Sequence, residues 1–529
     1  MTSIDTSTLA NMAAERDVEL VFALAGPVGT DLPAISRLLS DALKKCEYDA
    51  APEIRLSNLI KKIAVRQTLK RADGSNIELV DSPEEKRIHS YMDGGNAIRR
   101  MCGDNAALAS AAIAEVIASR GSKPSRRAYI LRSVKRADEV NLLRRVYGPG
   151  FFLIGVNMRR SDRVKRLASS IAASHGETTA SPNFANYQNA AELLARRDEE
   201  EEDPYGQRLR EVFQLADLFL SVDVDEGQLS FDEIYRFLRL ILGDLGETPR
   251  PEEQFMFHAF AASLASGALG RQVGAILTKN NREIVGAGWN DVPRGGGGLY
   301  RAGDHLDERD IKRDRDSTNE HADRMLEELA DAAEKAGWLA EGKRPSIEEA
   351  RRVLRKSGIM NLLEFGRTTH AEMEAVLSAA RVGVSVRDVF LYTTTFPCHE
   401  CARLIITAGI RRVIFIEPYQ KSRALELHGD AIVGYDAPPT ESCEAKDCSD
   451  LHYVEFSPFV GIGPRRFGDL FSLITPSGIR LERKTASGER KIWSASAAIP
   501  KVQMLPLSYL DLEQRAVSQL EEMLSKSKS

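Results

Sequence analysis

The sequence predicts an α/β protein with two domains, and three observations support this prediction. At 529 residues the chain is too long for one hydrophobic core. Short apolar runs typical of buried parallel strands alternate with helical stretches up to about residue 235. A new order, with a helix followed by two strands, begins near Pro251. We therefore divide the chain into a parallel α/β domain at residues 1–240 and a second α/β domain at residues 251–510.

The composition is that of an ordinary soluble protein. Hydrophobic residues make up 43% of the chain and charged residues 28%. No apolar run approaches the length of a membrane span, and the first residues show no signal-peptide core. Six cysteines in so long a chain argue against a disulfide scaffold. These features predict a cytoplasmic protein without a membrane partner.

The charge balance favours a small substrate. A net charge of -5 gives no overall attraction to nucleic acid. A local basic groove stays possible, because seven cations cluster in the first domain: Arg126, Arg127, Arg132, Lys135, Arg136, Arg144 and Arg145.

In the first domain a buried strand over Val18–Gly26 runs into a glycine turn and then a helix over residues 32–45. Further strands are predicted near Tyr129, Ile154 and Leu218. The acidic run from Asp198 to Asp203 breaks this pattern, and we interpret it as a solvated loop or helix face.

The glycine turn, "AGPVGTD", has part of what a phosphate-binding loop needs. A working P-loop reads G-x-x-x-x-G-K-[ST], and its lysine reaches the β- and γ-phosphates. Here Gly26 and Gly29 are only three residues apart, and Thr30 is followed by Asp31 instead of lysine. Backbone N–H groups at the start of the helix could still hold an anion. Gly26, Gly29 and Thr30 are thus either a site for a regulatory nucleotide or a purely structural turn.

Two short strings in the second domain predict a zinc site. "HAE" supplies His370 and Glu372, and "PCHEC" supplies Cys398 and Cys401. One imidazole and two thiols can hold Zn²⁺ with an open fourth position, where a water becomes acidic enough to ionise near neutral pH. Glu372 then fits as the group that accepts and returns the proton. The order H-x-E followed by P-C-x-x-C is the pattern of zinc nucleobase deaminases.

The local pattern supports this assignment. A helix follows Glu372, a buried strand covers residues 386–395, and a second helix opens at the cysteines. Two helix N-termini would therefore face the metal and favour anionic ligands. In the alternative interpretation, Cys398 and Cys401 are core thiols and His370 is structural, but the full set in this order disfavours it.

A hairpin precedes the zinc motifs. Strands at residues 273–278 and 284–287 flank a turn at Asn280 and Asn281, and the hairpin ends in "GWND". Asn290 in this string is a candidate for recognising a base or sugar, because its amide both donates and accepts hydrogen bonds. The alternative is an ordinary turn asparagine.

Three segments complete the second domain. Residues 300–364 predict an inserted, highly charged helical hairpin. The aromatic and glycine-rich stretch at residues 456–471 is expected to dock on the second domain, with Arg465 and Arg466 available to phosphate. Cys443, Cys448 and His452 could close a structural zinc site or stand in an unligated loop.

The first domain resembles P-loop nucleotide kinases beyond its glycine turn. The segment "SVKRADEVNLLRRVYGPGFFLIGVNMRRSDRVKRL" resembles their succession of a helix, a strand and an arginine-rich lid. The resemblance covers roughly Val18 to Asp225. Because the loop lysine is missing, it implies a degenerate kinase-like domain.

The second domain resembles the deoxycytidylate deaminase family over about Phe255 to Tyr419. The strings "RQVGAIL", "GWNDVPRG", "HAEMEAV" and "LYTTTFPCHECARLIITAGIRRVIF" occur in the family's order. The resemblance implies a cytidine-deaminase-like α/β/α sandwich with Zn²⁺ on His370, Cys398 and Cys401. It further implies Glu372 as general acid and base and Asn290 as a nucleotide contact. The insertion and the long tail depart from a minimal member.

The combination of both domains is similar to bacterial antiphage dCTP deaminases. This similarity implies conversion of dCTP, and also dCMP, to uracil nucleotides, in a homo-oligomer controlled by a regulatory nucleotide or an inhibitory small RNA. Three alternatives stay open: a housekeeping dCMP deaminase that supplies dUMP for thymidylate synthesis, a deaminase of polymeric RNA or DNA, and a nucleotide or RNA sensor.

Overall fold

The computed structural model describes most of the chain. The described residues are 18–121, 125–199, 201, 203–222, 227–313, 317–340, 342–354, 357, 366–417, 422–434, 453–475, 478–501 and 506–526. They form two compact units, residues 1–253 with 458–529 and residues 254–457. Among the described residues, no single helix has the length and apolarity to cross a membrane; one pair, Glu84–Cys102 with Ala107–Ser119, does so by length and composition but is bent by 95°.

The first unit is built on a mainly parallel sheet. Its strand order is β13-β6-β5-β1-β4-β2, with β3 also beside β4, and only β13 runs antiparallel. The strands are β1 (Leu20–Ala25), β2 (Asp49–Ala50), β3 (Ile54–Arg55), β4 (Arg127–Arg132), β5 (Phe151–Asn157), β6 (Leu218–Ser221) and β13 (Gly461–Ile462). The four strands predicted at residues 18–26 and near Tyr129, Ile154 and Leu218 are confirmed as β1, β4, β5 and β6.

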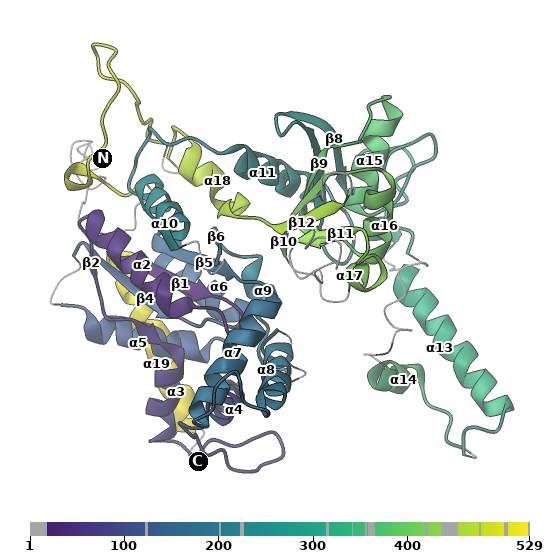
Figure 1. Ribbon diagram of the computed structural model, residues 1–529, viewed down its shortest axis with the longest axis horizontal. Helices are drawn as coiled ribbons and strands as arrows, with labels where there is room; N and C mark the ends of the chain where they lie inside the picture. Colours follow the sequence, from purple (N-terminus) through teal and green to yellow (C-terminus); the bar gives the residue numbers. More distant parts are fainter. Residues whose placement is uncertain are drawn as a thin grey trace, which may run out of the picture. The chain divides into compact units, whose positions relative to one another are not determined.

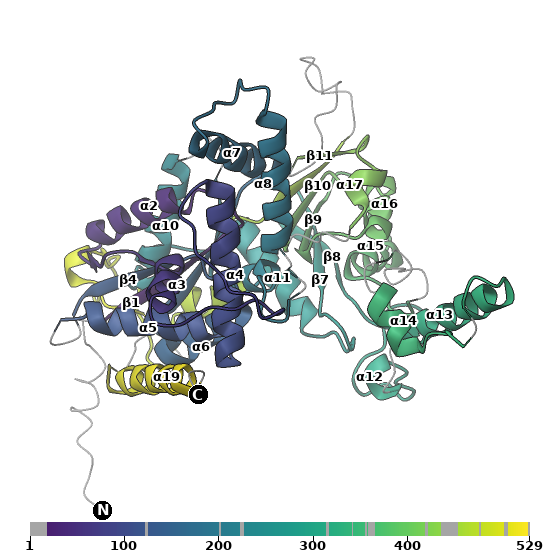
Figure 2. The ribbon, with the colours of Figure 1, turned by 90° about the horizontal axis from the view of Figure 1, so that it is seen from below.

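Helices cover both faces of this sheet. Their bounds are α2 (Leu32–Lys45), α3 (Leu56–Ala64), α4 (Glu84–Cys102), α5 (Ala107–Ser119), α6 (Ala137–Tyr147), α7 (Arg160–Ser174), α8 (Phe184–Glu199), α9 (Leu209–Phe213), α10 (Gly227–Ile241), α18 (Pro464–Phe471) and α19 (Pro506–Lys526). Figures 1 and 2 show α2 and α10 over one face, and α5, α6 and α19 over the other. Successive side chains of β1 point to opposite faces of the sheet. Leu20, Phe22 and Leu24 therefore share one face, and they pack in the core on the α2 side.

The last 70 or so residues belong to the first unit, so the compact second unit ends at residue 457 and not at 510. The Arg120 guanidinium holds the end of the chain in place: it pairs with Glu19 at 2.8 Å and with Glu513 of α19 at 2.7 Å. The Tyr509 hydroxyl also donates to Glu19, at 2.9 Å. Such long-range ion pairs leave no periodic signal in the sequence.

The aromatic and glycine-rich stretch follows the same division. β13 pairs with β6, and the Arg466 guanidinium in α18 contacts Asp217 at 3.1 Å and the carbonyl of Phe151 at 2.7 Å. From Pro458 onward the segment therefore belongs to the first unit and not to the second domain as expected, whereas Phe456 lies in the core of the second unit. Arg466 neutralises a buried carboxylate of its own unit, and this contact replaces the predicted contact with phosphate.

The acidic run begins with two buried carboxylates, those of Asp198 and Glu199. Asp198 is 0% exposed and Glu199 is 7% exposed. Their carboxylates pair with Lys135 at 2.8 Å and with Arg160 at 3.0 Å. The predicted solvated loop is wrong because cations distant in the sequence neutralise these acids inside the fold.

Several cations of the basic cluster also bind groups inside the first unit. Arg126 donates to the carbonyls of Cys46, Ala495 and Ala498, and Arg136 donates to those of Pro204 and Gly206. Arg144 pairs with the buried Asp217 at 3.0 Å. These three arginines stabilise loops of the first unit, so they are not available to the basic groove that motivated the polymer-deaminase alternative.

The second unit is a six-stranded mixed sheet of order β11-β12-β10-β9-β7-β8. The strands are β7 (Gly274–Lys279), β8 (Glu283–Trp289), β9 (Phe390–Thr395), β10 (Arg412–Glu417), β11 (Ile432–Gly434) and β12 (Val454–Pro458). β7 runs antiparallel to both neighbours, whereas β9 and β10 are parallel. Asn280 and Asn281 have φ of 51° each in the loop between β7 and β8, which confirms the predicted hairpin turn at these residues.

The α/β/α layering of this unit is confirmed. The helices are α11 (Pro251–Ser263), α12 (Asp310–Arg313), α13 (Ser317–Lys335), α14 (Ile347–Leu354), α15 (Ala371–Arg381), α16 (His399–Thr407) and α17 (Ala424–Leu427). A Cβ at Gly274 would meet the Ala259 carbonyl of α11, and one at Gly288 would meet the Ala371 carbonyl of α15. Since these glycines lie on opposite faces of the sheet, α11 and α15 cover opposite faces.

The charged insertion forms the predicted helical pair. The Arg351 guanidinium of α14 binds Asp323 of α13 at 2.5 Å, and α13 carries few buried side chains. The other predicted zinc candidates, Cys443, Cys448 and His452, lie outside the described residues.

Candidate active site

His370 stands at the start of α15, as the sequence predicted. It occupies the N-cap position, and Glu372 follows in the first turn of the helix. The backbone just before His370 is held by a β-bridge: Thr369 and Asp291 exchange backbone hydrogen bonds of 3.3 and 2.9 Å. The Asp291 side chain is buried and accepts from the N–H of Gly267 at 2.9 Å. Sequence reasoning missed this positioning role.

The two cysteines open α16. Cys398 is the N-cap residue, and its sulfur accepts the N–H of Cys401 at 3.5 Å. Both thiols are buried, and both belong to the core that β9, α15 and α16 share. Helix N-termini stabilise negative charge, so both cysteine sulfurs lie where a thiolate is favoured.

The three predicted ligands converge. The Nδ1 atom of His370 lies 3.2 Å from Sγ of Cys398 and 3.3 Å from Sγ of Cys401. All three ligand atoms lie within 4.8 Å of one another. A tetrahedral zinc ion with ordinary Zn–N and Zn–S bonds would hold such atoms about 3.5 Å apart. The donor set and its spacing therefore fit Zn²⁺ with one position left for a water or substrate.

Glu372 is buried next to this set. Its side chain is 3% exposed, and its Oε2 accepts a hydrogen bond from Sγ of Cys401 at 3.4 Å. Thr393 of β9, which sequence reasoning missed, donates to the other oxygen at 3.5 Å. Burial raises the pKa of Glu372, which favours a carboxylate that accepts a proton readily.

The three ligand side chains have pKa values shifted in different directions. The hydrogen bond from Cys401, followed by that from His370, lowers the pKa of Cys398 to about 4. The hydrogen bond with Cys398 raises the pKa of His370 to about 8, and it raises the pKa of Cys401 as well. Cys398 is thus already held as the thiolate that a metal requires.

The comparisons with known proteins agree with this geometry. Residues 249–417 match the family model described as the cytidine and deoxycytidylate deaminase zinc-binding region. The matched segment is about a third of the chain, and it contains Glu372 and all three converging ligands. The cofactor of the family is zinc, and His370, Cys398 and Cys401 form the corresponding metal site here.

Relatives of this deaminase region cover about a third of the chain. The deoxycytidylate deaminase of Enterobacteria phage T4 is 26% identical over 179 residues, which are 31% of this chain and 77% of the phage protein. The crystal structure of dCMP deaminase from the cyanophage S-TIM5 with dCMP and dUMP is 20% identical, with a TM-score of 0.22; the match covers 40% of this chain and 99% of that one. A gluconokinase structure from Sinorhizobium meliloti 1021 is 14% identical, with a TM-score of 0.20, over 42% of this chain and 97% of that one.

Asn290 directly follows β8 in the second unit, and both ends of its amide bind backbone. Oδ1 accepts the N–H of Val273 at 2.7 Å, and Nδ2 donates to the carbonyl of Arg271 at 2.7 Å. The side chain therefore fixes the loop that enters β7. Each amide end keeps one further hydrogen-bonding position, so contact with a nucleotide stays a prediction.

The glycine turn lies in the other unit, between β1 and α2. Gly29 has a φ of 90°, and a Cβ there would lie 2.6 Å from the carbonyl oxygen of Arg163, so only glycine fits. Asp31 caps α2, with its Oδ1 accepting the N–H of Ala34 at 3.1 Å. The structure thus gives Gly29 and Asp31 defined backbone roles, whereas nucleotide binding by Gly26, Gly29 and Thr30 stays a prediction.

Proposed function

We propose that this protein is a cytoplasmic, zinc-dependent hydrolytic deaminase of deoxycytidine nucleotides. The observation that supports this most is the convergence of His370, Cys398 and Cys401 beside the buried carboxylate of Glu372. The same residues lie within the segment that matches the deaminase family. Relatives named deoxycytidylate deaminase supply the substrate class.

The chain's own residues account for the proton transfers that deamination needs. When bound to His370, Cys398 and Cys401, Zn²⁺ would acidify a water and polarise it for attack on C4 of the cytosine. Glu372 receives the proton of this water as its oxygen adds to C4, and passes it to N3. Glu372 then takes the second proton, from the oxygen now bound to C4, and gives it to the amino group; the C4–N bond breaks, the C4 carbonyl forms and ammonia departs. Burial suits this carboxylate to both steps, since its raised pKa brings proton uptake and release closer in energy.

We assign dCTP as the preferred substrate and dCMP as a second one, with Asn290 contacting the nucleotide. Purified protein is to be incubated separately with dCMP, dCDP and dCTP, while its zinc content is measured in the same preparation. We expect uracil nucleotides from dCTP and dCMP in proportion to bound zinc. Turnover of dCMP alone would overturn the substrate assignment and identify the housekeeping reaction, whereas no turnover with zinc bound would overturn the deaminase itself.

The biological role we propose is depletion of dCTP during phage infection, by a homo-oligomer controlled by a nucleotide or a small RNA. Its support is the sequence resemblance of the two-domain arrangement. Cells expressing the wild-type protein should lose most of their dCTP pool after infection, and cells expressing Glu372→Gln should keep it. Equal pools in the two strains after infection would contradict the defensive role.

A further inference from the structure

The anion position of the glycine turn is already filled by a side chain of the same unit. The backbone N–H of Val28 donates to Oδ2 of Asp198 at 2.7 Å, although the two residues are 170 positions apart. Asp198 comes from the last turn of α8 and is 0% exposed. A backbone N–H in such a turn is the type of group that binds a phosphate oxygen. Here it binds a carboxylate oxygen.

The cation that the turn lacks in sequence is supplied by a neighbouring strand. Lys135 follows β4, which lies beside β1 in the sheet. Its ammonium donates to Oδ2 of Asp198 at 2.8 Å and to the carbonyl of Gly26 at 2.9 Å. The lysine therefore reaches the turn from outside it and meets the anion at the same oxygen as Val28.

Two polar atoms at this point are buried and unused by the described residues. They are the second carboxylate oxygen of Asp198, Oδ1, and the hydroxyl oxygen of Thr30. A buried polar atom without a partner costs free energy. A phosphate group offers more oxygens than a carboxylate and could accept the Thr30 hydroxyl as well as the Val28 N–H. A phosphate would therefore satisfy more of the hydrogen-bonding groups of this site than Asp198 does.

Further cations around the turn are held by the same end of α8. Arg163, which is 3% exposed, donates to the carbonyl of Val28 and pairs with Glu199 at 3.2 Å. Arg160 pairs with Glu199 at 3.0 Å. If the end of α8 withdraws, Lys135, Arg160 and Arg163 lose these partners together. That much positive charge suits an anion with several charges.

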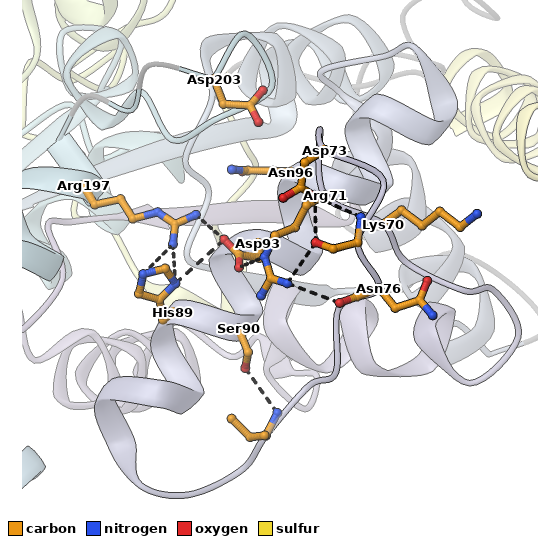
Figure 3. Close-up of polar contacts among 12 residues, drawn as sticks. Lys70, Arg71, Asp73, Asn76, His89, Ser90, Asp93, Asn96, Arg197 and Asp203 are labelled. Atoms are coloured by element: carbon orange, nitrogen blue, oxygen red, sulfur yellow. Dashed lines mark hydrogen bonds and ion pairs between the residues drawn. The ribbon is translucent and has the colours of Figure 1, made fainter.

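The last turn of α8, residues 196–199, carries only charged side chains and makes polar contacts with α4, whereas Ala191 and Leu194 earlier in the helix pack in an apolar cluster with α7. Figure 3 shows Arg197, the residue before Asp198, bound to Asp93 at 2.6 Å and to Nδ1 of His89 at 2.6 Å. His89 is 60% exposed at its side chain. Contacts between charged side chains can exchange for contacts with water, so the last turn can move while Ala191 and Leu194 keep the rest of α8 packed on α7.

We propose that Asp198 is an internal substitute for phosphate, and that the glycine turn with Lys135 binds a polyphosphate, as nucleoside triphosphates carry, when this carboxylate withdraws. The site is separate from the zinc centre, and the inference does not depend on the proposed deaminase activity. Binding at Gly26, Gly29 and Thr30 is predicted from the sequence. The structure adds Asp198, which occupies the site, and Lys135, which supplies its cation.

Binding of inorganic tripolyphosphate at constant ionic strength, measured by calorimetry, tests the proposal. Asp198→Asn keeps the shape of the side chain and removes its charge, so we expect affinity to rise by about tenfold or more, because like charges in contact are strongly unfavourable. Adding Lys135→Met to Asp198→Asn should abolish this gain. Equal affinity of wild type and Asp198→Asn, or a gain that survives Lys135→Met, would overturn the proposal.

A measurement on the wild-type protein avoids any folding defect of the variants. Saturating tripolyphosphate should accelerate hydrogen exchange in residues 191–199 of α8 while α2 stays protected. Bound tripolyphosphate with unchanged exchange in α8 would contradict displacement of Asp198. Repeating the titration with dCTP and ATP separates the two sources of polyphosphate: tighter binding than tripolyphosphate indicates a nucleotide, and equal binding indicates recognition of the phosphate chain alone.

Discussion

Replacing Glu372 with glutamine is expected to lower the rate of deoxycytidine nucleotide deamination by about 10²–10⁴-fold, the usual contribution of a positioned general acid and base. Glutamine has nearly the same shape, but its amide cannot accept the proton of the attacking water. The three ligand atoms are left intact, so the zinc content should not change. Steady-state rates with dCMP and dCTP, together with zinc quantified by mass spectrometry, check this prediction.

Glu374→Gln is the matched control for this experiment. Glu374 lies two residues after Glu372 in α15 and is 5% exposed. Its carboxylate pairs with Arg381 at the end of the helix. The two variants remove the same charge from the same helix, but only the Glu372 side chain contacts a metal ligand, whereas Glu374 meets His370 through its backbone N–H alone. We expect Glu374→Gln to keep wild-type activity. Wild-type activity in Glu372→Gln would contradict the proposed proton transfer, and loss of zinc in that variant would show that Glu372 supports the metal site itself.

The parts of the fold that depend on local pattern could be predicted from the sequence. β1 and α2 follow from an apolar run, a glycine turn and a helical period, and the hairpin turn at Asn280 and Asn281 follows from its residue type. The metal ligands could be found for the same reason. Their chemistry depends on short spacings, and His370 and Cys398 each begin a helix that the pattern around them also predicts.

Contacts between distant segments could not be predicted. The acidic run at residues 198–203 has the composition of a solvated face, and only the fold brings Lys135 and Arg160 to it. The tail after residue 457 likewise carries no signal for its partner, because Arg120 and Glu513 are 393 positions apart. In both places a charged residue that would be expected at the surface pairs with an opposite charge inside the fold.

The role of Asn290 shows the limit of motif reasoning within the site. The amide that was expected to meet a nucleotide also fixes the backbone of Arg271 and Val273. Thr393 shows the converse, because a threonine within a buried strand has no distinctive pattern, yet its hydroxyl reaches Glu372. Motif spacing identifies groups that react with a ligand, whereas it does not identify the groups that hold them in position.

Removing a zinc ligand should abolish both metal binding and activity. In Cys398→Ala the sulfur that lies 3.2 Å from Nδ1 of His370 is lost, and with it the residue that caps α16. Two remaining ligands leave too few donors for a tetrahedral site. Without the metal the pKa of the attacking water stays far above neutral, so turnover should fall by several orders of magnitude.

Chelation of the wild-type protein should cause the same loss of activity, with one difference that identifies the site. Added Zn²⁺ should restore the chelated wild type and leave Cys398→Ala inactive. Cys102→Ala is the control, because this half-buried thiol ends α4 in the other unit and should affect neither zinc content nor rate. Zinc is to be measured per chain alongside activity. Full zinc content in Cys398→Ala would place the metal elsewhere, and full activity in the zinc-free wild type would exclude a metal-dependent reaction at this site.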